Sequence, residues 1–301
     1  MLTIFAIPKP FVGHIGVIQR NAISSWLGLD PRPEIILLGR ENGVEEVVRE
    51  HSLGWIPDIE TTPYGTPLLG DGFRKVCARA RFPLLAYVNC DIMFGQDLID
   101  TLASISCPKF LAVGRRTNIE LTTAVSADDL LDSSFLPRLA AAGSLETPFA
   151  IDYFLFPACP ELCNIPQFAV GRPGWDNWML YNALAHHMPL IETTAAIRAL
   201  HQNHHYHHVP MQRGAAWEGP EADVNRTLAG SPDRLQFSLL DATHHVTLQG
   251  TVTANPTSSA RSIRLLIAGH SMLKWPLKIL GFPILFTDRR KRRRAKKSGY
   301  K

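Results

Sequence analysis

The sequence has little cysteine and no recognisable signal peptide. Its 301 residues include five cysteines, an odd number, and no Cys-x-x-Cys pair. We therefore expect neither a disulfide framework nor a thiolate zinc site, and a reducing compartment is favoured. The first residues lack a basic region and a small-residue cleavage site, and their apolar run predicts a strand. These absences together predict a cytoplasmic protein.

Two common nucleotide-binding motifs are also missing. Neither Gly-x-Gly-x-x-Gly nor Gly-x-x-x-x-Gly-Lys-Ser/Thr occurs, which disfavours a Rossmann dehydrogenase and a P-loop NTPase. No internal repeat or low-complexity segment precedes the basic C-terminus. With 46% hydrophobic and 19% charged residues, the composition is typical of a globular protein with a sizeable core. The length allows one large α/β domain or two smaller ones.

Positive charge is concentrated at the C-terminus. Eight basic residues lie between Arg289 and Lys297, and Lys301 adds a ninth. The rest of the chain has 22 basic and 27 acidic residues, a net charge of about −5. An acidic body with a basic tail predicts that the tail binds an anionic partner, and it argues against a nucleic-acid-binding protein.

Apolar runs and helical patterns alternate through the first half of the chain. Short, nearly continuous apolar runs predict buried strands, and apolar residues at helical spacing predict helices between them. This alternation predicts a mostly parallel sheet with helices on both faces. The strands are expected at 2–7, 34–39, 84–88, 109–114, 151–156 and 194–200, and the helices at 14–27, 44–51, 71–81 and 175–187.

Parallel sheets bind ligands beyond the carboxyl ends of their strands. This rule selects four segments: Pro8 to His14, Gly39 to Asn42, Asn89 to Asp91, and Arg115 with Arg116.

Asp91 ends the third predicted strand and is followed by another apolar segment. A carboxylate between two apolar segments is costly unless it is paired or bound to a cation. Mg²⁺ or Mn²⁺ would accept its oxygen and bridge to a diphosphate. The alternative is that Asp91 caps the next helix or a turn.

Residues 201–208 form a block, His-Gln-Asn-His-His-Tyr-His-His, in which six residues could ligate a metal or donate to a phosphate. The spacing from His201 to His204 is not by itself a zinc signature. We expect most of these histidines to lie on the surface. His201 is the best ligand candidate because it ends an apolar run.

Two further aspartates are candidates for chemistry. Asp176 lies in the first turn of the helix that follows Gly171-Arg172-Pro173-Gly174, flanked by Trp175 and Trp178. It is either a carboxylate that suits the helix dipole, with both indoles in the core, or a general base at the mouth of a pocket. Asp152 lies inside an apolar strand, where it could bind an acceptor hydroxyl or be a hydrogen-bonded structural residue.

A glycine-rich turn opens the helix that begins near Asp71. Its first turns carry Arg74 and Lys75. A helix N-terminus with nearby cations suits a phosphate or the ribose of a nucleotide.

Four motifs support a family resemblance. The chain contains Tyr-x-Asn-x-Asp-Ile at 87–92, Asp-Tyr-Phe-x-Phe-Pro at 152–157, Gly-Arg-x-x-Trp-Asp-Asn-Trp at 171–178 and His-Gln-Asn-His-x-Tyr at 201–206. With the strand–helix order, these motifs resemble a poorly characterised bacterial and plant group of nucleotide-diphospho-sugar transferases with the A-type glycosyltransferase fold. The resemblance covers roughly residues 2 to 250.

The resemblance implies roles for particular residues. The metal, Mn²⁺ or Mg²⁺, would be held by Asp91 and His201, although Asn89 replaces the first Asp of the usual Asp-x-Asp motif. Asp176 would act as the catalytic base.

The sequence itself selects the other site residues. Asp152 is a second candidate catalytic residue, because it could bind an acceptor hydroxyl. The nucleotide-diphosphate sugar is expected over the strand ends, and the candidate cofactor-binding residues are Pro8, Asp71, Arg74, Asn89 and Asp91.

The resemblance also predicts the division of the chain and its activity. A single α/β transferase domain would span 1–255, with a donor-binding half to about 115 and an acceptor half from 116. The activity would be sugar transfer to a glycan or lipid-linked acceptor. Three alternatives remain: a sugar-nucleotide nucleotidyltransferase, a non-catalytic sugar- or lipid-binding module for which Asn89 is the best support, and a metal hydrolase built on the histidines.

The C-terminal segment has the composition of a membrane-interface helix. The apolar stretch 265–286 is interrupted by His270, Lys274 and Lys278 and by two prolines. At 100° per residue, Arg264 and these three residues fall within an arc of roughly 120°. A one-sided helix followed by a basic tail predicts peripheral binding to an anionic membrane, here the inner face. The alternative is a core helix with a solvated tail. We expect residues 262–301 to be dispensable for catalysis.

Overall fold

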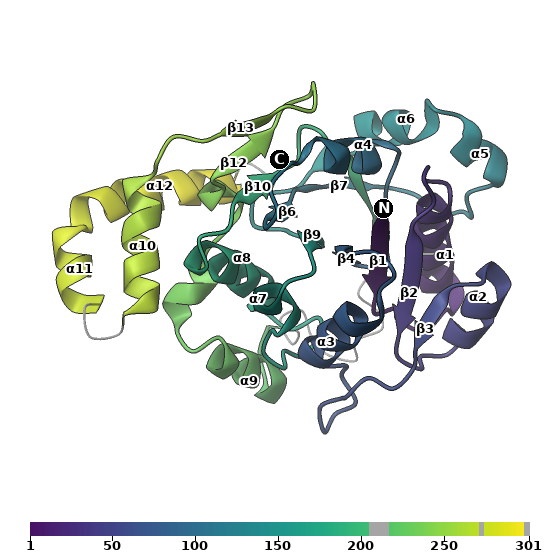
Figure 1. Ribbon diagram of the computed structural model, residues 1–301, viewed down its shortest axis with the longest axis horizontal. Coiled ribbons are helices and arrows are strands. Elements are labelled where there is room, and N and C mark those ends of the chain that lie inside the picture. Colours follow the sequence, from purple (N-terminus) through teal and green to yellow (C-terminus); the bar gives the residue numbers. More distant parts are fainter. Residues whose placement is uncertain (205–216, 271–273, 298–301) are drawn as a thin grey trace.

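The computed structural model describes residues 1–204, 217–270 and 274–297. It is a mixed α/β structure with one large, mostly parallel sheet and one small sheet, and helices cover both faces of the large sheet (Figure 1). The expected fold class is confirmed.

The large sheet has nine strands. Across the sheet the order is β13 (Val252–Ala254), β12 (His244–Val246), β10 (Leu190–Glu192), β6 (Leu111–Val113), β9 (Tyr153–Pro157), β4 (Leu84–Val88), β1 (Leu2–Ala6), β2 (Glu34–Leu38) and β3 (Gly54–Ile56). Parallel pairs join β1 to β2 and β4, β2 to β3, and β10 to β6 and β12, whereas β9 and β13 run antiparallel to their neighbours.

The small sheet collects strands that are far apart in the sequence. Its order is β5 (Ile92–Met93), β11 (Ala199–Gln202), β7 (Arg116–Ile119) and β8 (Ser144–Leu145). Because β5 directly follows β4, the chain passes from the large sheet into the small one at Asp91. Both expected halves, 1–115 and 116–255, contribute strands to both sheets, and their functional division remains a prediction.

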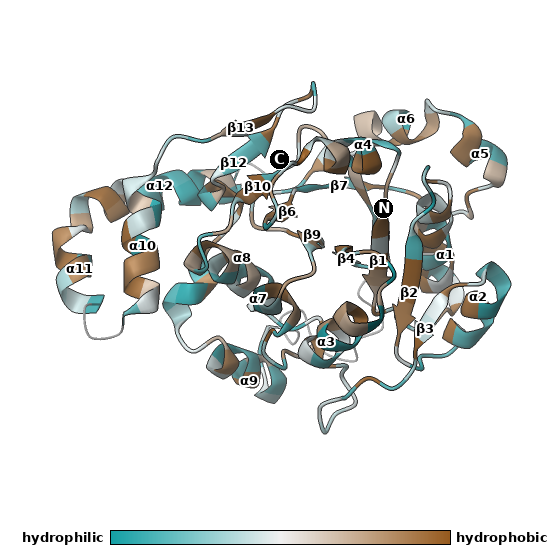
Figure 2. Cartoon of the chain, viewed as in Figure 1, coloured by the Kyte–Doolittle hydropathy of each residue, from teal (hydrophilic) through white to brown (hydrophobic). Residues whose placement is uncertain are grey.

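The helices pack on two separate cores. One core lies between the large sheet and α3, α7 and α8, and the other lies under α1, α2, α4 and the small sheet. Figure 2 shows hydrophobic residues on these elements where they meet the sheet. The helices before residue 250 are α1 (Gly13–Leu27), α2 (Val44–His51), α3 (Leu69–Arg79), α4 (Asp97–Ser104), α5 (Ala127–Leu131), α6 (Phe135–Ala142), α7 (Pro160–Cys163), α8 (Trp175–Ala185), α9 (Pro220–Leu228), and the 3₁₀ turns η1 (Pro232–Gln236) and η2 (Leu239–Asp241).

The C-terminal segment forms three helices, not the single broken helix expected from the sequence. They are α10 (Ser259–Gly269), α11 (Lys274–Leu280) and α12 (Phe282–Lys297), and they lie at one end of the molecule (Figure 1). Within the described residues, no helix is long and apolar enough to cross a membrane.

The cysteines depart from the sequence expectation. Cys77 on α3 and Cys163 on α7 form a disulfide with a Cα–Cα distance of 6.0 Å. Cys90, Cys107 and Cys159 are free thiols. One disulfide and three free thiols give an odd number of cysteines, so the odd number did not exclude a single pair. The prediction that the chain has no disulfide is therefore wrong, and cysteine content no longer supports a reducing compartment.

Candidate metal and sugar-nucleotide site

Asp91 lies where β4 leaves the large sheet at its carboxyl end. The backbone N–H of Asn89 donates to the carbonyl of Asp152 on the neighbouring strand at 2.9 Å, and Ile92 N–H donates to Asn89 O at 3.1 Å. These two bonds form a tight turn from β4 into β5. The turn presents the Asp91 side chain at the junction of the two sheets.

The histidine block reaches Asp91 through strand pairing. β11 runs antiparallel to β5, and His201 is paired in register with Ile92, the residue after Asp91. Gln202 then secures this junction: its side-chain amide donates to Asp91 O at 3.2 Å and to Ile18 O on α1 at 2.8 Å. Its oxygen accepts from Asn21 at 2.9 Å. Gln202 is fully buried, so its polar atoms serve to fix Asp91 relative to β11 and α1.

Asp91, His201 and His204 form a cluster with the donor atoms of a metal site. Their candidate ligand atoms lie within 4.8 Å of one another. Asp91 Oδ2 is 3.2 Å from His204 Nε2 and 3.7 Å from His201 Nε2. Asp91 Oδ1 and His201 Nδ1 are buried and have no hydrogen-bond partner among residues 1–204, 217–270 and 274–297. Buried polar atoms are rarely left unpaired, so these two atoms fit a site that binds a cation.

The protonation states also suit metal binding. Burial opposes ionisation of Asp91, but the hydrogen bond with His204 and the charges of His201 and Lys9 outweigh it and hold the pKa at about 2. Burial lowers the pKa of His201, although the Asp91 charge partly opposes this effect. A metal ligand must be an ionised carboxylate or a neutral imidazole, and near neutral pH these residues provide both.

Asp152 is held beside this cluster by two partners. Its Oδ1 accepts from the Asn89 side chain at 2.7 Å and its Oδ2 accepts from Arg116 at 2.8 Å. Asp152 is buried and Arg116 is largely buried. The Arg116 charge also contributes to lowering the pKa of His201. Asn89, Asp152 and Arg116 therefore form a polar network adjoining the candidate metal ligands.

Asp176 lies in the first turn of α8, and its pKa responds to the charge of Asp152 in this network. Gly174, with φ of 102°, is the residue before the helix, and this left-handed conformation suits glycine. Burial raises the pKa of Asp176 to about 6, and the negative charge of Asp152 contributes to the shift. The pKa of Asp176 is thus displaced toward neutrality, as a general base requires.

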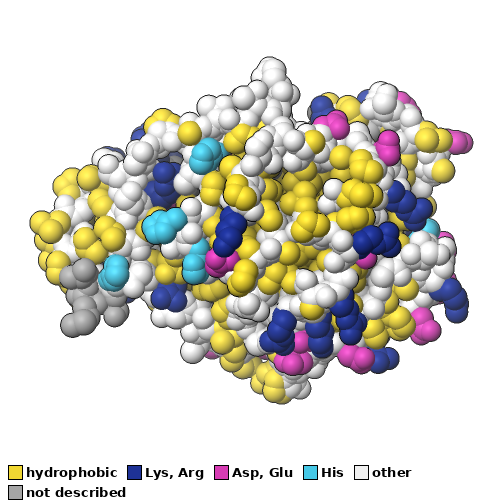
Figure 3. Space-filling model, in the orientation of Figure 1, with side chains coloured by type: hydrophobic (Ala, Val, Ile, Leu, Met, Phe, Trp, Pro, Cys, Tyr) yellow, Lys and Arg dark blue, Asp and Glu magenta, His cyan; other side chains and the backbone are white. Residues whose placement is uncertain are grey.

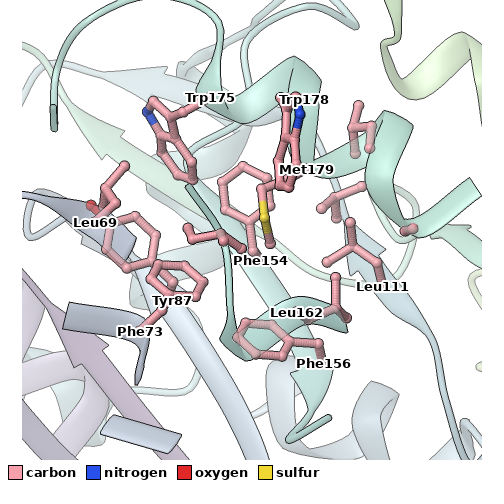
Figure 4. Close-up of a cluster of buried hydrophobic side chains, with 14 of the residues drawn as sticks. Leu69, Phe73, Tyr87, Leu111, Phe154, Phe156, Leu162, Trp175, Trp178 and Met179 are labelled. Carbon is pink, nitrogen blue, oxygen red and sulfur yellow. The ribbon is translucent and has the colours of Figure 1, made fainter. Parts of the chain in front are cut away.

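The two tryptophans beside Asp176 belong to the core. Trp175 packs against Phe154 and Tyr87 with ring centroids 4.8 and 5.3 Å away (Figure 4). Trp178 packs against Phe168 with ring centroids 5.4 Å apart. These contacts fix the first turn of α8 and the position of Asp176. The expectation that both indoles are core residues is confirmed, and it is compatible with a catalytic Asp176.

The predicted nucleotide-binding residues lie in two places. Pro8 is buried just after β1. The charge of the next residue, Lys9, helps to lower the pKa of Asp91. Asp71 is buried at the start of α3 and pairs with Arg74 at 2.8 Å and Lys75 at 2.7 Å. It also accepts from Glu60 N–H at 2.9 Å. Asp71 thereby orders the loop before α3, and a nucleotide-binding role for these residues remains a prediction.

Three residues of the site were not selected from the sequence. His204 and Gln202 belong to the block 201–208, in which the sequence predicts His201 as the best ligand candidate. Arg116 belongs to one of the strand-end segments. The sequence carries no signal that distinguishes His204 from the other histidines of the block. His205 and Tyr206, part of the same motif, lie outside the described residues.

No protein-family model matches the chain, and no curated protein matches it. Among solved structures, it is similar to Staphylococcus aureus TarS 1–349 in complex with UDP-GlcNAc, with a TM-score of 0.46 and 12% identity over 89% of this chain and 80% of that chain. A second TarS 1–349 structure gives 0.41 and 10%, over 67% of this chain and 57% of that chain.

The chain is also similar to glucosyl-3-phosphoglycerate synthase from Mycobacterium tuberculosis in complex with Mn²⁺, UDP and phosphoglyceric acid. The TM-score is 0.45 and the identity 11%, over 77% of this chain and 79% of that chain. Similarity at this level does not assign an activity to this chain.

Proposed function

We propose that this protein is a metal-dependent glycosyltransferase that uses a nucleotide-diphosphate sugar. The observation that carries the proposal is the cluster of Asp91, His201 and His204 at the carboxyl end of a parallel strand. Asp176 adds a candidate base, and its raised pKa reflects in part the charge of Asp152, which lies in the polar network adjoining the cluster. A cation site at the carboxyl end of a parallel sheet, together with a base, suits the transfer of a sugar from a nucleoside diphosphate.

Asp91, His201 and His204 would hold the divalent cation. Two imidazole nitrogens and one carboxylate suit Mn²⁺ better than Mg²⁺, which prefers oxygen ligands. When bound, such an ion neutralises the diphosphate charge that develops as the sugar is released. Gln202 supports the ligands by fixing the Asp91 backbone against β11 and α1.

Asp176 would accept the proton of the acceptor hydroxyl. Its pKa of about 6 leaves it ionised at neutral pH, yet more basic than an ordinary carboxylate. Asp152 would orient the acceptor, and Arg116 and Asn89 fix its carboxylate through their hydrogen bonds. Pro8, Asp71, Arg74 and Asn89 would bind the nucleotide portion of the donor along the strand ends.

The acceptor would be a glycan or a lipid-linked molecule, and the enzyme would be peripheral on a membrane. The C-terminal helices support this placement by their exposed apolar and basic residues. The inner membrane face remains a prediction from the sequence, and the Cys77–Cys163 disulfide argues against a reducing compartment.

The proposal is tested by incubating the protein with a panel of sugar nucleotides, Mn²⁺ and candidate acceptors while nucleotide release is measured. Acceptor-dependent release of a nucleoside diphosphate supports transfer. With pyrophosphate added in place of the acceptor, formation of a nucleoside triphosphate and a sugar 1-phosphate would instead identify a nucleotidyltransferase. Donor binding without turnover across the panel would identify a binding module.

A metal-dependent hydrolase is a second candidate, because two histidines and one aspartate can also hold an ion that activates water. Mn²⁺-dependent release of nucleotide that no acceptor accelerates, with free sugar as the product, would favour the hydrolase over the transferase.

A further inference from the structure

The C-terminal helices are attached to the domain by the polar residues that the sequence suggested would face water or headgroups. Lys274 and Lys278 on α11 contact the Asp233 carboxylate on η1 at 2.7 and 3.1 Å. Asp233 is buried. The charged residues of α11 therefore face the domain.

A second set of ion pairs secures α10 and α12. Arg264 and Arg292 both pair with Asp241, which has no exposed surface, and both also pair with Asp288 on α12. Of the polar arc expected from the sequence, Arg264 is buried, and Lys274 and Lys278 are partly exposed but bind a buried carboxylate of the domain. We call these ion pairs to Asp233 and Asp241 the clasp.

The clasp leaves the apolar residues of the segment exposed. Of seventeen large apolar side chains that are exposed among the described residues, seven lie between Leu266 and Phe286. Figure 3 shows hydrophobic side chains at the end of the molecule where Figure 1 places α11. We call this set the apolar face: Leu266, Trp275, Ile279, Leu280, Phe282, Ile284 and Phe286.

Exposed cations continue directly from the apolar face. On α12, Arg292 is held in the clasp, whereas seven other basic residues are exposed. Arg290 lies over the ring of Phe286, 5.6 Å from its centroid, so charge and apolar surface meet at this point. The exposed cations are Arg289, Arg290, Lys291, Arg293, Arg294, Lys296 and Lys297.

We propose that α10–α12 form a membrane-docking surface in which the apolar face inserts into an anionic phospholipid bilayer while the clasp holds the helices on the domain. Apolar side chains gain by leaving water, and adjacent cations bind acidic headgroups. A folded partner protein would need a complementary acidic rim as well. The inference deepens the membrane location given under the proposed function, and it does not depend on catalytic activity.

Vesicle flotation tests the surface in the full-length protein. The wild type should float with vesicles of phosphatidylcholine mixed with phosphatidylglycerol, and less with phosphatidylcholine alone. Replacing Trp275, Ile279 and Leu280 by serine should reduce vesicle binding by at least about tenfold, because the favourable free energy of transferring these apolar side chains from water into lipid is lost. The reduction should be the same at low and high salt, since this free energy does not depend on charge. Replacing Leu131 and Leu248 by serine is the matched control, since both are equally exposed but lie outside the face.

Charge is tested separately with Arg293→Gln and Arg294→Gln. Each should weaken binding to anionic vesicles by about fivefold at low salt and leave binding to neutral vesicles unchanged. Trp275→Phe should retain binding but lose the largest part of the blue shift in fluorescence that vesicles induce. The same flotation with Asp91→Ala, a variant expected to be inactive, separates failure of this surface from failure of the proposed activity.

Three results would overturn the inference. The wild type could fail to float with either type of vesicle, or the triple serine variant could bind as the wild type does. Sedimentation could also show a dimer that the serine substitutions convert into a monomer, which would make the apolar face an interface between copies of the chain.

Discussion

Asp176, in the first turn of α8, has a raised pKa that predicts how turnover should depend on pH. As a general base it must be ionised, so turnover should rise as the pH increases through about 6. Asp176→Asn should lower turnover by roughly 10²–10⁴-fold and abolish this rise. Initial rates measured between pH 5 and 8 would check this, and an unchanged pH profile in the variant would assign the titration to another group.

The same pKa shift predicts an opposite trend for stability. The folded-state pKa of Asp176 is raised above its ordinary value, so the folded state binds the proton of this carboxyl more tightly than the unfolded state does. The stabilising contribution of the protonated carboxyl to the free energy of unfolding is therefore fully present below pH 4 and is lost as the pH rises through about 6. Asp176→Asn should therefore unfold at the same temperature as the wild type, or higher, at pH 8. A marked loss of stability there would indicate a structural carboxylate.

The three candidate metal ligands make a second prediction. Asp91→Ala should abolish Mn²⁺-dependent donor binding in calorimetry, because it removes the anionic ligand. His204→Ala should weaken Mn²⁺ binding about as much as His201→Ala does. Asn203→Ala is a neighbouring control, since its amide faces Glu120 and not Asp91. Equal donor affinity with and without a chelator in the wild type would contradict a metal site.

At the scale of elements, α3 depends on a close approach that only glycine allows. A Cβ on Gly70 would lie 2.6 Å from Ile165 O and 2.7 Å from Pro166 O, both backbone atoms that cannot turn aside. Gly70→Ala should thus destabilise the protein by about 1–3 kcal/mol in urea unfolding. Gly269→Ala is the control, because its Cβ would meet nothing within 4 Å. Similar effects of both substitutions would show that α3 can move away.

The elements that sequence predicted well are those with a local signal. The strands at Leu2–Ala6 and Leu84–Val88 and the helix at Val44–His51 match their expected positions almost to the residue, because buried apolar runs and helical periodicity are local properties. The small sheet was missed. Its strands have two to four residues each and acquire their hydrogen bonds from partners up to about a hundred residues away.

The same distinction applies to the site. Asp91 could be selected from its place after an apolar strand, and Asp176 from the start of a helix. His204 could not be separated from its neighbours, because only the pairing of β11 with β5 determines which histidines reach Asp91. The sequence also did not show whether the polar residues of the C-terminal helices face the domain or the solvent. Their partners Asp233 and Asp241 lie in short segments whose sequence gives no indication that they bind these residues.

For the whole molecule, the clasp predicts that residues 262–301, which the sequence predicts to be dispensable for catalysis, contribute to stability. Truncation near Thr257 would take Arg264 and Arg292 from Asp241 and remove Leu265 and Ala268, which pack on the core that includes α8. Loss of partners for a buried carboxylate costs about 3–5 kcal/mol. The truncated chain should unfold at lower urea concentration, and Asp241→Asn should recover part of the loss. An unchanged unfolding midpoint would show that the segment is dispensable.

The Cys77–Cys163 disulfide divides the chain into a covalent ring and two arms. The ring, residues 77–163, contains Asp91 and Asp152, whereas Asp176 and His201 belong to the C-terminal arm. A protease that cuts once between residues 121 and 134 would open the ring without releasing a fragment. The nicked protein should migrate as one species in denaturing electrophoresis and separate into two only after reduction. The candidate metal site joins the same two fragments, because Asp91 lies before such a cut whereas His201 and His204 lie after it. A bound ion would therefore be a second, reversible link between the fragments that the disulfide connects covalently.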